Sequence, residues 1–350
     1  MKVDILIAVG LWGGMENAIN RTGRYLSEQN EEIRIVQCVW QGRYWADEKL
    51  AFYCLDVENH AVTIEEMTDA YTDFVEKQGV PDVVIATGLP IMCRVAAGTR
   101  INLDEDFKII GWTHGPIEAA EAGEGGSLND FENVDFAFAI NDHIKDTLEY
   151  LLLPTQVIRV RNCYDNAGIK YGENRNRNAF GFVGRLDVHK NIMGALQAFA
   201  MVEEKDWIFH VVGEGPDTDE VHSFIAEHHL DKNVILHGWN DHPWEILSEC
   251  RTLIFPSIGI HEAAPLVILE ALACGMAVFS TRVGNTEEVI QSGTNGYFFD
   301  SSNELATLIL GQLDGSLDLP VGSVCRESAD AFAPDKALED FYRKMIKCMT

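Results

Sequence analysis

The chain has 350 residues, a hydrophobic content of 47% and a formal net charge of −28. This length favours two domains, and acidic residues spread over both halves argue against a nucleic-acid partner and allow at most peripheral contact with an anionic membrane. The eight cysteines form no Cys-x-x-Cys pair and mostly lie in apolar runs. We therefore expect buried, reduced thiols in a cytoplasmic protein, with no metal site.

Apolar runs typical of buried strands alternate with helical patterns from the N-terminus onward. Strands are expected at residues 4–9, 33–39, 83–87, 108–112 and 136–140, and helices at 17–29, 64–77 and 142–151. No run reaches the 18 apolar residues of a membrane span, and the first apolar run is too short for a signal peptide. The alternation predicts a parallel, doubly wound sheet.

The same alternation starts again after a polar segment at residues 165–178, which we interpret as a linker. Strands are expected at residues 180–183, 208–212, 234–236, 253–255, 277–280 and 297–299, and helices near 192–201, 218–229, 242–249, 265–273 and 285–292. We predict a first domain at 1–166, a second at 167–331, and an amphipathic helix at 332–350 that packs back on the first. The expected architecture is two Rossmann-like domains facing across a cleft.

Two glutamates eight positions apart are the most informative feature of the second half. Glu262 follows the apolar run that ends at Pro256, and Glu270 lies on the helix predicted from Pro265 onward. A strand end followed by a helix N-terminus is where open α/β sheets bind ligands. Glu262 could instead complement the helix dipole and Glu270 could be a solvated surface residue, but the pair together favours a binding site.

Two cations follow the first strand of the second half. Gly184 ends that strand, Arg185 comes next, and Lys190 lies just before a helix. A glycine permits close backbone approach, and an arginine fork with a mobile lysine charge suits a phosphate. Surface ion pairs, one of them to Asp187, are the competing interpretation.

Glycines and a histidine follow other strands. Gly13 and Gly14 open the first helix, and Gly213 ends a strand in Gly-Glu-Gly-Pro; either cluster could admit a phosphate or could only make a tight turn. Neither completes Gly-x-Gly-x-x-Gly, which argues against a nicotinamide-dependent oxidoreductase. His114 after residues 108–112 could donate to a hydroxyl or fill a structural role.

Other chemistries find little support. His261-Glu262 lacks the second histidine of His-Glu-x-x-His because residue 265 is proline, so a metalloprotease is excluded. Ser127 and Ser257 lack the surroundings of a nucleophilic serine. The aromatic stretch from Trp40 to Trp45, with Arg43 and Tyr44, is either an acceptor-binding patch or simple surface packing.

With these motifs in place, the chain resembles the retaining glycosyltransferases of family 4, which have the GT-B fold. The resemblance rests on Gly13-Gly14, Gly184-Arg185-Leu…Lys190, Gly213-x-Gly-Pro, and the two glutamates in Pro-Ser-x₄-Glu-x₇-Glu-Ala-Leu-Ala-Cys-Gly. The stretch from Leu236 to Glu245 is similar to bacterial lipopolysaccharide galactosyltransferases.

The resemblance implies transfer of a hexose, with retention, from a nucleotide sugar such as UDP-glucose or UDP-galactose to a glycan, glycolipid or glycoprotein in cell-surface polysaccharide synthesis. It implies no cofactor and no metal. By position, Arg185 and Lys190 would hold the diphosphate, Glu262 the sugar hydroxyls and Glu270 the ribose. His114, which would contact the donor sugar, is the fourth implied catalytic residue beside Arg185, Lys190 and Glu262. The remaining implied donor contacts are Gly13, Gly14, Gly184, Gly213, Ala264, Pro265 and Leu266.

The chain departs from the family pattern at three positions. Ala263 and Ala264 replace the usual glycine and phenylalanine after the first glutamate, which leaves the donor sugar open, and residue 282 is arginine. A non-catalytic partner of a true transferase and a nucleotide-sugar epimerase remain alternatives. Both would keep the same fold.

Overall fold

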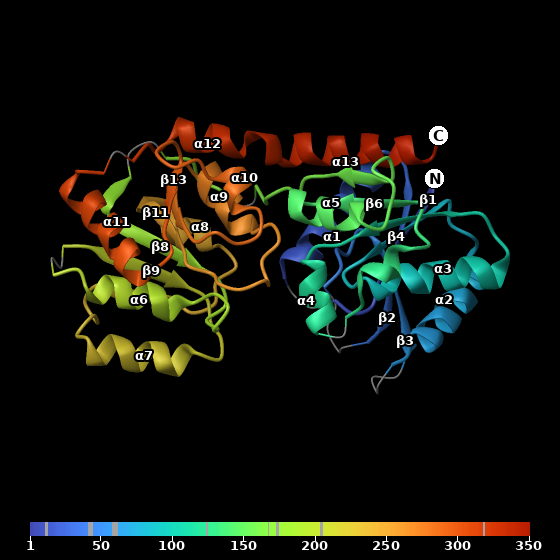
Figure 1. Ribbon diagram of the computed structural model, residues 1–350, viewed down its shortest axis with the longest axis horizontal. Helices are drawn as coiled ribbons and strands as arrows, with labels where there is room; N and C mark the ends of the chain where they lie inside the picture. Colours follow the sequence, from blue (N-terminus) through green and yellow to red (C-terminus); the bar gives the residue numbers. More distant parts are fainter. Residues whose placement is uncertain are drawn as a thin grey trace. The chain divides into compact units, whose positions relative to one another are not determined.

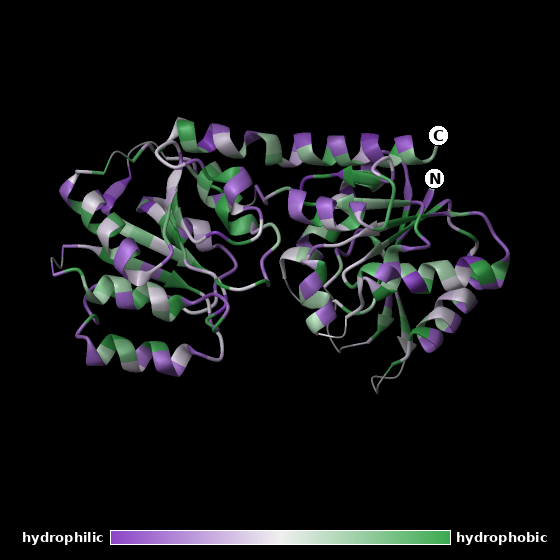
Figure 2. Ribbon diagram, in the orientation of Figure 1, coloured by the Kyte–Doolittle hydropathy of each residue, from purple (hydrophilic) through white to green (hydrophobic). Residues whose placement is uncertain are grey.

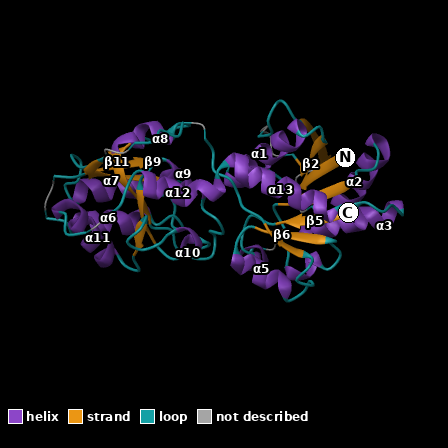
Figure 3. Cartoon of the chain, turned by 90° about the horizontal axis from the view of Figure 1, so that it is seen from above, coloured by secondary structure: helices purple, strands orange, loops and turns teal. Residues whose placement is uncertain are grey.

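The computed structural model describes residues 1–10, 13–40, 45–57, 62–123, 125–166, 168–172, 175–203, 206–317 and 319–350. Two compact units make up the chain (Figure 1): Met1–Asn162 together with Ala337–Thr350, and Cys163–Lys336. In each unit the strands lie between helices (Figure 3). This layering follows from the alternating apolar runs, because a sheet that is buried on both faces needs helices over each of them.

The described part of the first unit contains a seven-stranded parallel sheet in the order β3-β2-β1-β4-β5-β6-β7. Its strands are β1 (Lys2–Ile7), β2 (Glu32–Val39), β3 (Ala51–Val57), β4 (Val83–Thr87), β5 (Lys108–Trp112), β6 (Phe136–Ala139) and β7 (Val157–Arg159). The strand order reverses between β1 and β4, which makes the ends of these two strands the switch point of the sheet.

Helices of the first unit connect these strands, and the C-terminal helix joins them. Their bounds are α1 (Gly14–Glu28), α2 (Ile64–Gln78), α3 (Ile91–Leu103), α4 (Ile117–Ala122), the 3₁₀ turn η1 (Leu128–Phe131), α5 (Asp142–Glu149) and α13 (Pro334–Cys348). Phe341 of α13 contacts the rings of Trp112 and Phe138 at centroid distances of 5.0 Å and 5.1 Å. Polar and apolar residues alternate along α13 (Figure 2), as expected for a helix with one buried face.

A buried ion pair holds the amino end of the first sheet. Arg34 on β2 donates to both carboxylate oxygens of Asp4 on β1, and the Tyr71 hydroxyl donates to Asp4 Oδ2 at 2.7 Å. Arg34 also donates to the carbonyls of Gln78 and Gly79, each at 3.0 Å. Since Asp4 is fully buried, loss of one partner would leave an uncompensated charge inside the unit.

The described part of the second unit contains a six-stranded parallel sheet in the order β10-β9-β8-β11-β12-β13. Its strands are β8 (Asn176–Val183), β9 (Ile208–Val212), β10 (Val234–Leu236), β11 (Cys250–Phe255), β12 (Ala277–Ser280) and β13 (Gly296–Phe298). Here the order reverses between β8 and β11, which pair directly, for example through Leu253 and Gly181.

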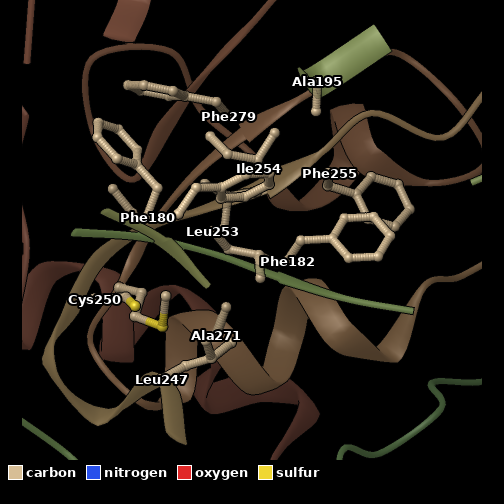
Figure 4. Close-up of a cluster of buried hydrophobic side chains, with 14 of the residues drawn as sticks. Phe180, Phe182, Ala195, Leu247, Cys250, Leu253, Ile254, Phe255, Ala271 and Phe279 are labelled. Atoms are coloured by element: carbon tan, nitrogen blue, oxygen red, sulfur yellow. The ribbon is translucent and has the colours of Figure 1, made fainter. Parts of the chain in front are cut away.

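The helices of the second unit follow the strands in turn. They are α6 (Ile192–Ala200), α7 (Thr218–Glu227), α8 (Pro243–Ile246), η2 (Leu247–Glu249), α9 (Leu266–Ala273), α10 (Thr286–Val289), α11 (Ser302–Asp314), α12 (Ser323–Ala329) and η3 (Asp330–Phe332). Side chains of β8, β11 and β12, among them Phe180, Leu253 and Phe279, form the core around the central strands (Figure 4).

Several local predictions need correction. The predicted linker is partly strand, because β8 begins at Asn176. Arg175 before it is buried and donates to the carbonyls of Ser248 at 2.7 Å and Cys250 at 3.1 Å, so this end of the segment is anchored in the second unit. Pro265 is the N-cap of α9 rather than a residue of its first turn. All of the cysteines except Cys54 are buried, as predicted.

Candidate functional site

The site begins at the switch point of the second sheet. The chain leaves β8 at Val183 and runs through residues 184–191 into α6, and it leaves β11 at Phe255 and runs through residues 256–265 into α9. β8 and β11 are parallel neighbours, so both connections start at the carboxyl edge of the sheet. This edge is where open α/β sheets bind ligands.

Lys190 and Glu262 meet there, although 72 residues separate them in sequence. The Lys190 ammonium donates to Glu262 Oε1, and its Nζ lies 5.9 Å from the centroid of the Phe255 ring. The side chains are 30% and 14% exposed, respectively. A cation held beside an apolar ring and a carboxylate, yet open to solvent on one side, can reach an incoming anion.

The loop that carries Lys190 is shaped by local hydrogen bonds. Asp187 Oδ1 accepts from the backbone nitrogens of His189 and Lys190, both at 3.0 Å. Asn191 has a left-handed backbone (φ 50°), caps α6 at Gly194, and donates to the Pro256 carbonyl at 3.1 Å. This last bond ties the connection after β8 to the connection after β11.

Arg185 behaves differently from Lys190. Its side chain is 68% exposed, and Nε lies 3.5 Å from Asp187 Oδ2 within the same loop. The surface ion pair with Asp187, the competing interpretation of Arg185, is therefore present. Lys190 pairs with Glu262 instead. An exposed pair of this kind contributes little energy, so Arg185 can exchange Asp187 for another anion.

Gly213 and Gly215 pack against the backbone of the Arg185 loop. A Cβ on Gly213 would lie 1.9 Å from the Gly184 carbonyl oxygen, and one on Gly215 would lie 2.2 Å from that of Leu186. Two hydrogen bonds, Gly184 N to Val212 O and Leu186 N to Glu214 O, both at 3.1 Å, hold the two loops together. These glycines are needed for packing whether or not Gly213 also contacts a ligand.

The connection from Glu262 to α9 is packed from behind. Ala263 is buried, its carbonyl accepts from Asn285 N at 2.9 Å, and a Cβ on Gly284 would lie 2.7 Å from the Glu262 and Ala263 carbonyl oxygens. The backbone φ of Ala263 is not positive, so a residue with a β-carbon fits there without backbone strain. Ala264 and Leu266 are half-buried on either side of the buried Pro265.

Glu270 is the fifth residue of α9, and its side chain is half-buried. The structure thus brings Lys190 and Glu262 into contact and places Gly184 and Arg185 in the same connection as Lys190. Arg282, which had no interpretation from the sequence, pairs with Asp300 at 2.8 Å and covers the Phe298 ring at 4.7 Å. These two surface contacts account for Arg282 in structural terms.

The predicted residues of the first unit follow β1 and β5. Gly13 is the N-cap of α1 and Gly14 its first residue, and both are exposed. The extended φ of Gly13 (−165°) requires no glycine, but a Cβ there would lie 3.2 Å from Glu16 Oε2. Leu11 and Trp12 of this loop lie outside the described residues.

His114 follows β5 and is held against Trp112, with ring centroids 4.1 Å apart. Its Nε2 is buried and has no hydrogen-bond partner in the described ranges. Burial lowers the pKa of His114 to about 3. The imidazole is therefore neutral at ordinary pH and can donate or accept one hydrogen bond to a ligand, but cannot supply a positive charge.

The aromatic stretch near Trp40 does not form the predicted patch in full. Trp45 is 1% exposed and its indole nitrogen donates to Gln37 Oε1 at 2.6 Å, so it belongs to the core. Arg43 and Tyr44 lie outside the described residues. In the described ranges no helix is long and apolar enough to cross a membrane, and no cluster of three or more His, Cys, Asp or Glu side chains is placed to bind a metal.

Known proteins share this fold and parts of this sequence. Residues 165–314 match the family model of glycosyl transferases group 1. The lipopolysaccharide 1,6-galactosyltransferase of Escherichia coli K12 is 22% identical over 289 residues, 77% of this chain and 76% of the relative. The apo form of the lipopolysaccharide outer core galactosyltransferase WaaB superimposes with a TM-score of 0.81 at 18% identity, covering 99% of each chain. Anabaena HepE in complex with UDP does so with a TM-score of 0.80 at 16% identity, covering 99% and 100%.

The matched stretch lies within the second unit and belongs to the group 1 glycosyl transferases, and the two parallel-sheet units form the GT-B fold, as predicted. Within that class the chain is similar to the lipopolysaccharide galactosyltransferases, which confirms the predicted resemblance. The numbered family stays a prediction.

Proposed function

We propose that this protein transfers a hexose, with retention of anomeric configuration, from UDP-glucose or UDP-galactose to a glycan, glycolipid or glycoprotein of the cell surface. The observation that carries the proposal is the contact between Lys190 and Glu262 at the switch point of the second sheet. A lysine beside a carboxylate at this edge matches a ligand with a phosphate at one end and hydroxyls at the other. The complex of HepE with UDP supports the choice of nucleotide.

The chemical barrier is loss of a nucleoside diphosphate from the anomeric carbon. Lys190, half-buried, and Arg185, exposed, would stabilise the negative charge that grows on the leaving oxygen. Glu262 would accept hydrogen bonds from hydroxyls of the transferred sugar, and Glu270 from the ribose. Removal of one such electrostatic contact lowers rates by about 10²–10³ in enzymes of other classes.

The reaction as proposed needs no resident metal and no covalent enzyme intermediate. The acceptor hydroxyl attacks on the face from which the diphosphate departs and passes its proton to the departing phosphate, which retains the configuration. His114 would assist as a neutral hydrogen-bonding group, in keeping with its lowered pKa. We place the protein in the cytoplasm, where nucleotide sugars are made, with at most peripheral membrane contact.

The deciding experiment measures UDP release and sugar transfer with UDP-glucose and UDP-galactose, each with and without a lipopolysaccharide core acceptor. We expect acceptor-dependent UDP release with one of the two donors, and an α-linked product by NMR. Lys190→Ala should abolish most of it, whereas Lys232→Ala, an exposed lysine in the turn before β10, should not.

Other outcomes of the same experiment point to the alternatives. A new nucleotide sugar formed without acceptor would identify an epimerase. Binding of UDP without turnover of either donor, or of any other nucleotide sugar, would identify a non-catalytic partner.

A further inference from the structure

Ser257, which lacks the surroundings of a nucleophilic serine, contacts the Glu262 carboxylate. Ser257, two residues after β11, is fully buried, and its hydroxyl donates to Glu262 Oε1 at 3.2 Å. The Lys190 ammonium donates to the same oxygen. Within the described residues, both hydrogen bonds to the Glu262 carboxylate therefore end on Oε1, and Oε2 remains to accept a hydrogen bond from a ligand.

Two neighbouring segments fix the backbone around Ser257. Asn191 donates to the Pro256 carbonyl at 3.1 Å, the Thr281 hydroxyl donates to the Ser257 carbonyl, and Ile258 N donates to the His189 carbonyl at 2.8 Å. The partners of these bonds lie in the connections after β8 and β12. The Ser257 hydroxyl is consequently a fixed donor, while the Lys190 ammonium ends a flexible chain.

We propose that Ser257 is a positioning residue: it retains Glu262 Oε1 in place when Lys190 turns from Glu262 to the donor diphosphate. This inference rests on the proposed function. Lys190 faces two anions once the donor is bound, and a carboxylate held by the lysine alone would follow it or swing free. A second donor on a rigid backbone keeps Oε2 directed at the sugar hydroxyl, since a hydrogen bond to a charged acceptor is stronger than a neutral one.

The test compares Ser257→Ala with Ser280→Ala. Ser280 is equally buried, and its hydroxyl donates to the Thr281 carbonyl at 2.7 Å rather than to Glu262. Loss of one hydrogen bond to a charged group should lower kcat of Ser257→Ala by about tenfold or more. The Kd for UDP alone should change less than about twofold, because UDP carries no hexose for Glu262 to bind, and Ser280→Ala should retain wild-type kcat.

A double-mutant cycle separates positioning from simple packing. In a Glu262→Ala background, Ser257→Ala should cause no further loss of kcat, because the carboxylate it positions is gone. Ser257→Cys, which keeps a weaker donor, should lie between the wild type and Ser257→Ala. Additive losses in the cycle, or equal losses in both Ser257 variants with lowered melting temperatures, would overturn the inference.

Failure of the inference can be told from failure of the proposed function. If the wild type releases UDP from its donor and Ser257→Ala does so at the same rate, only the role of Ser257 is wrong. If the wild type turns over no nucleotide sugar, the proposed function and this inference both fail.

Discussion

Gly213→Ala should destabilise the second unit, because the space a β-carbon needs is already occupied. The new Cβ would lie 1.9 Å from the Gly184 carbonyl oxygen, whereas real contacts essentially never fall below 3.0 Å. The two loops would have to separate by about 1.1 Å, the difference of these two distances. The backbone φ of 137° is also one that alanine rarely adopts.

The expected magnitude follows from these two effects. Overpacking and backbone strain each contribute about 1–3 kcal/mol, so the loss should be about 2–6 kcal/mol. At about 2–4 °C per kcal/mol for a domain of this size, the melting temperature of the unit should fall by at least about 4 °C. Displacement of Gly184 would also disturb Arg185 and Lys190, so affinity for UDP should fall with stability.

Gly184→Ala is the matched control. Its Cβ would first meet Phe182 Cζ at 3.3 Å, a contact that a small ring movement relieves, and its φ is not positive. Thermal unfolding followed by circular dichroism should give near-wild-type stability for this variant. Titration with UDP measures the ligand affinity of both variants. If Gly213→Ala melts within about 1 °C of the wild type but loses UDP affinity, Gly213 is a ligand contact and the packing argument is refuted.

Three further predictions concern both units. Lys190→Ala should reduce turnover about 100-fold or more with little change in melting temperature, because its pair with Glu262 is partly exposed; normal turnover would remove Lys190 from the site. Asp4→Ala should cost about 3–5 kcal/mol in urea unfolding, since it leaves Arg34 buried and uncompensated, and a loss below about 1 kcal/mol would contradict this. The folded pKa of His114 is lowered to about 3, so the unfolded state binds more protons than the folded state between pH 6.5 and 3. Lowering the pH through this range should therefore reduce the free energy of unfolding, by at most about 1.4 kcal/mol per pH unit from this group. His114→Gln should show a shallower fall, and equal slopes in the two proteins would show that the imidazole is not desolvated.

The order of elements was largely readable from the sequence, but some were missed. Apolar runs bounded by polar turns located the central strands, for example β4 and β9, whose observed bounds equal those predicted. The prediction omitted β3 and β7, at the two edges of the first sheet, and the helices α3, α4, α11 and α12. Edge strands are less buried and α3 contains four β-branched residues and a glycine, so their patterns are weak.

Sequence motifs by themselves predicted Arg185, Lys190, Glu262 and Glu270 as candidate site residues, because charged residues next to buried strand ends are uncommon without a ligand. Local spacing carries no information about partners far away in the chain. Only the tertiary structure decided that Lys190 pairs with Glu262, that the Gly184 carbonyl occupies the Cβ position of Gly213, and that Trp45 belongs to the core. Each of these depends on contacts between segments 29 or more residues apart, or on burial that the pairing of strands creates.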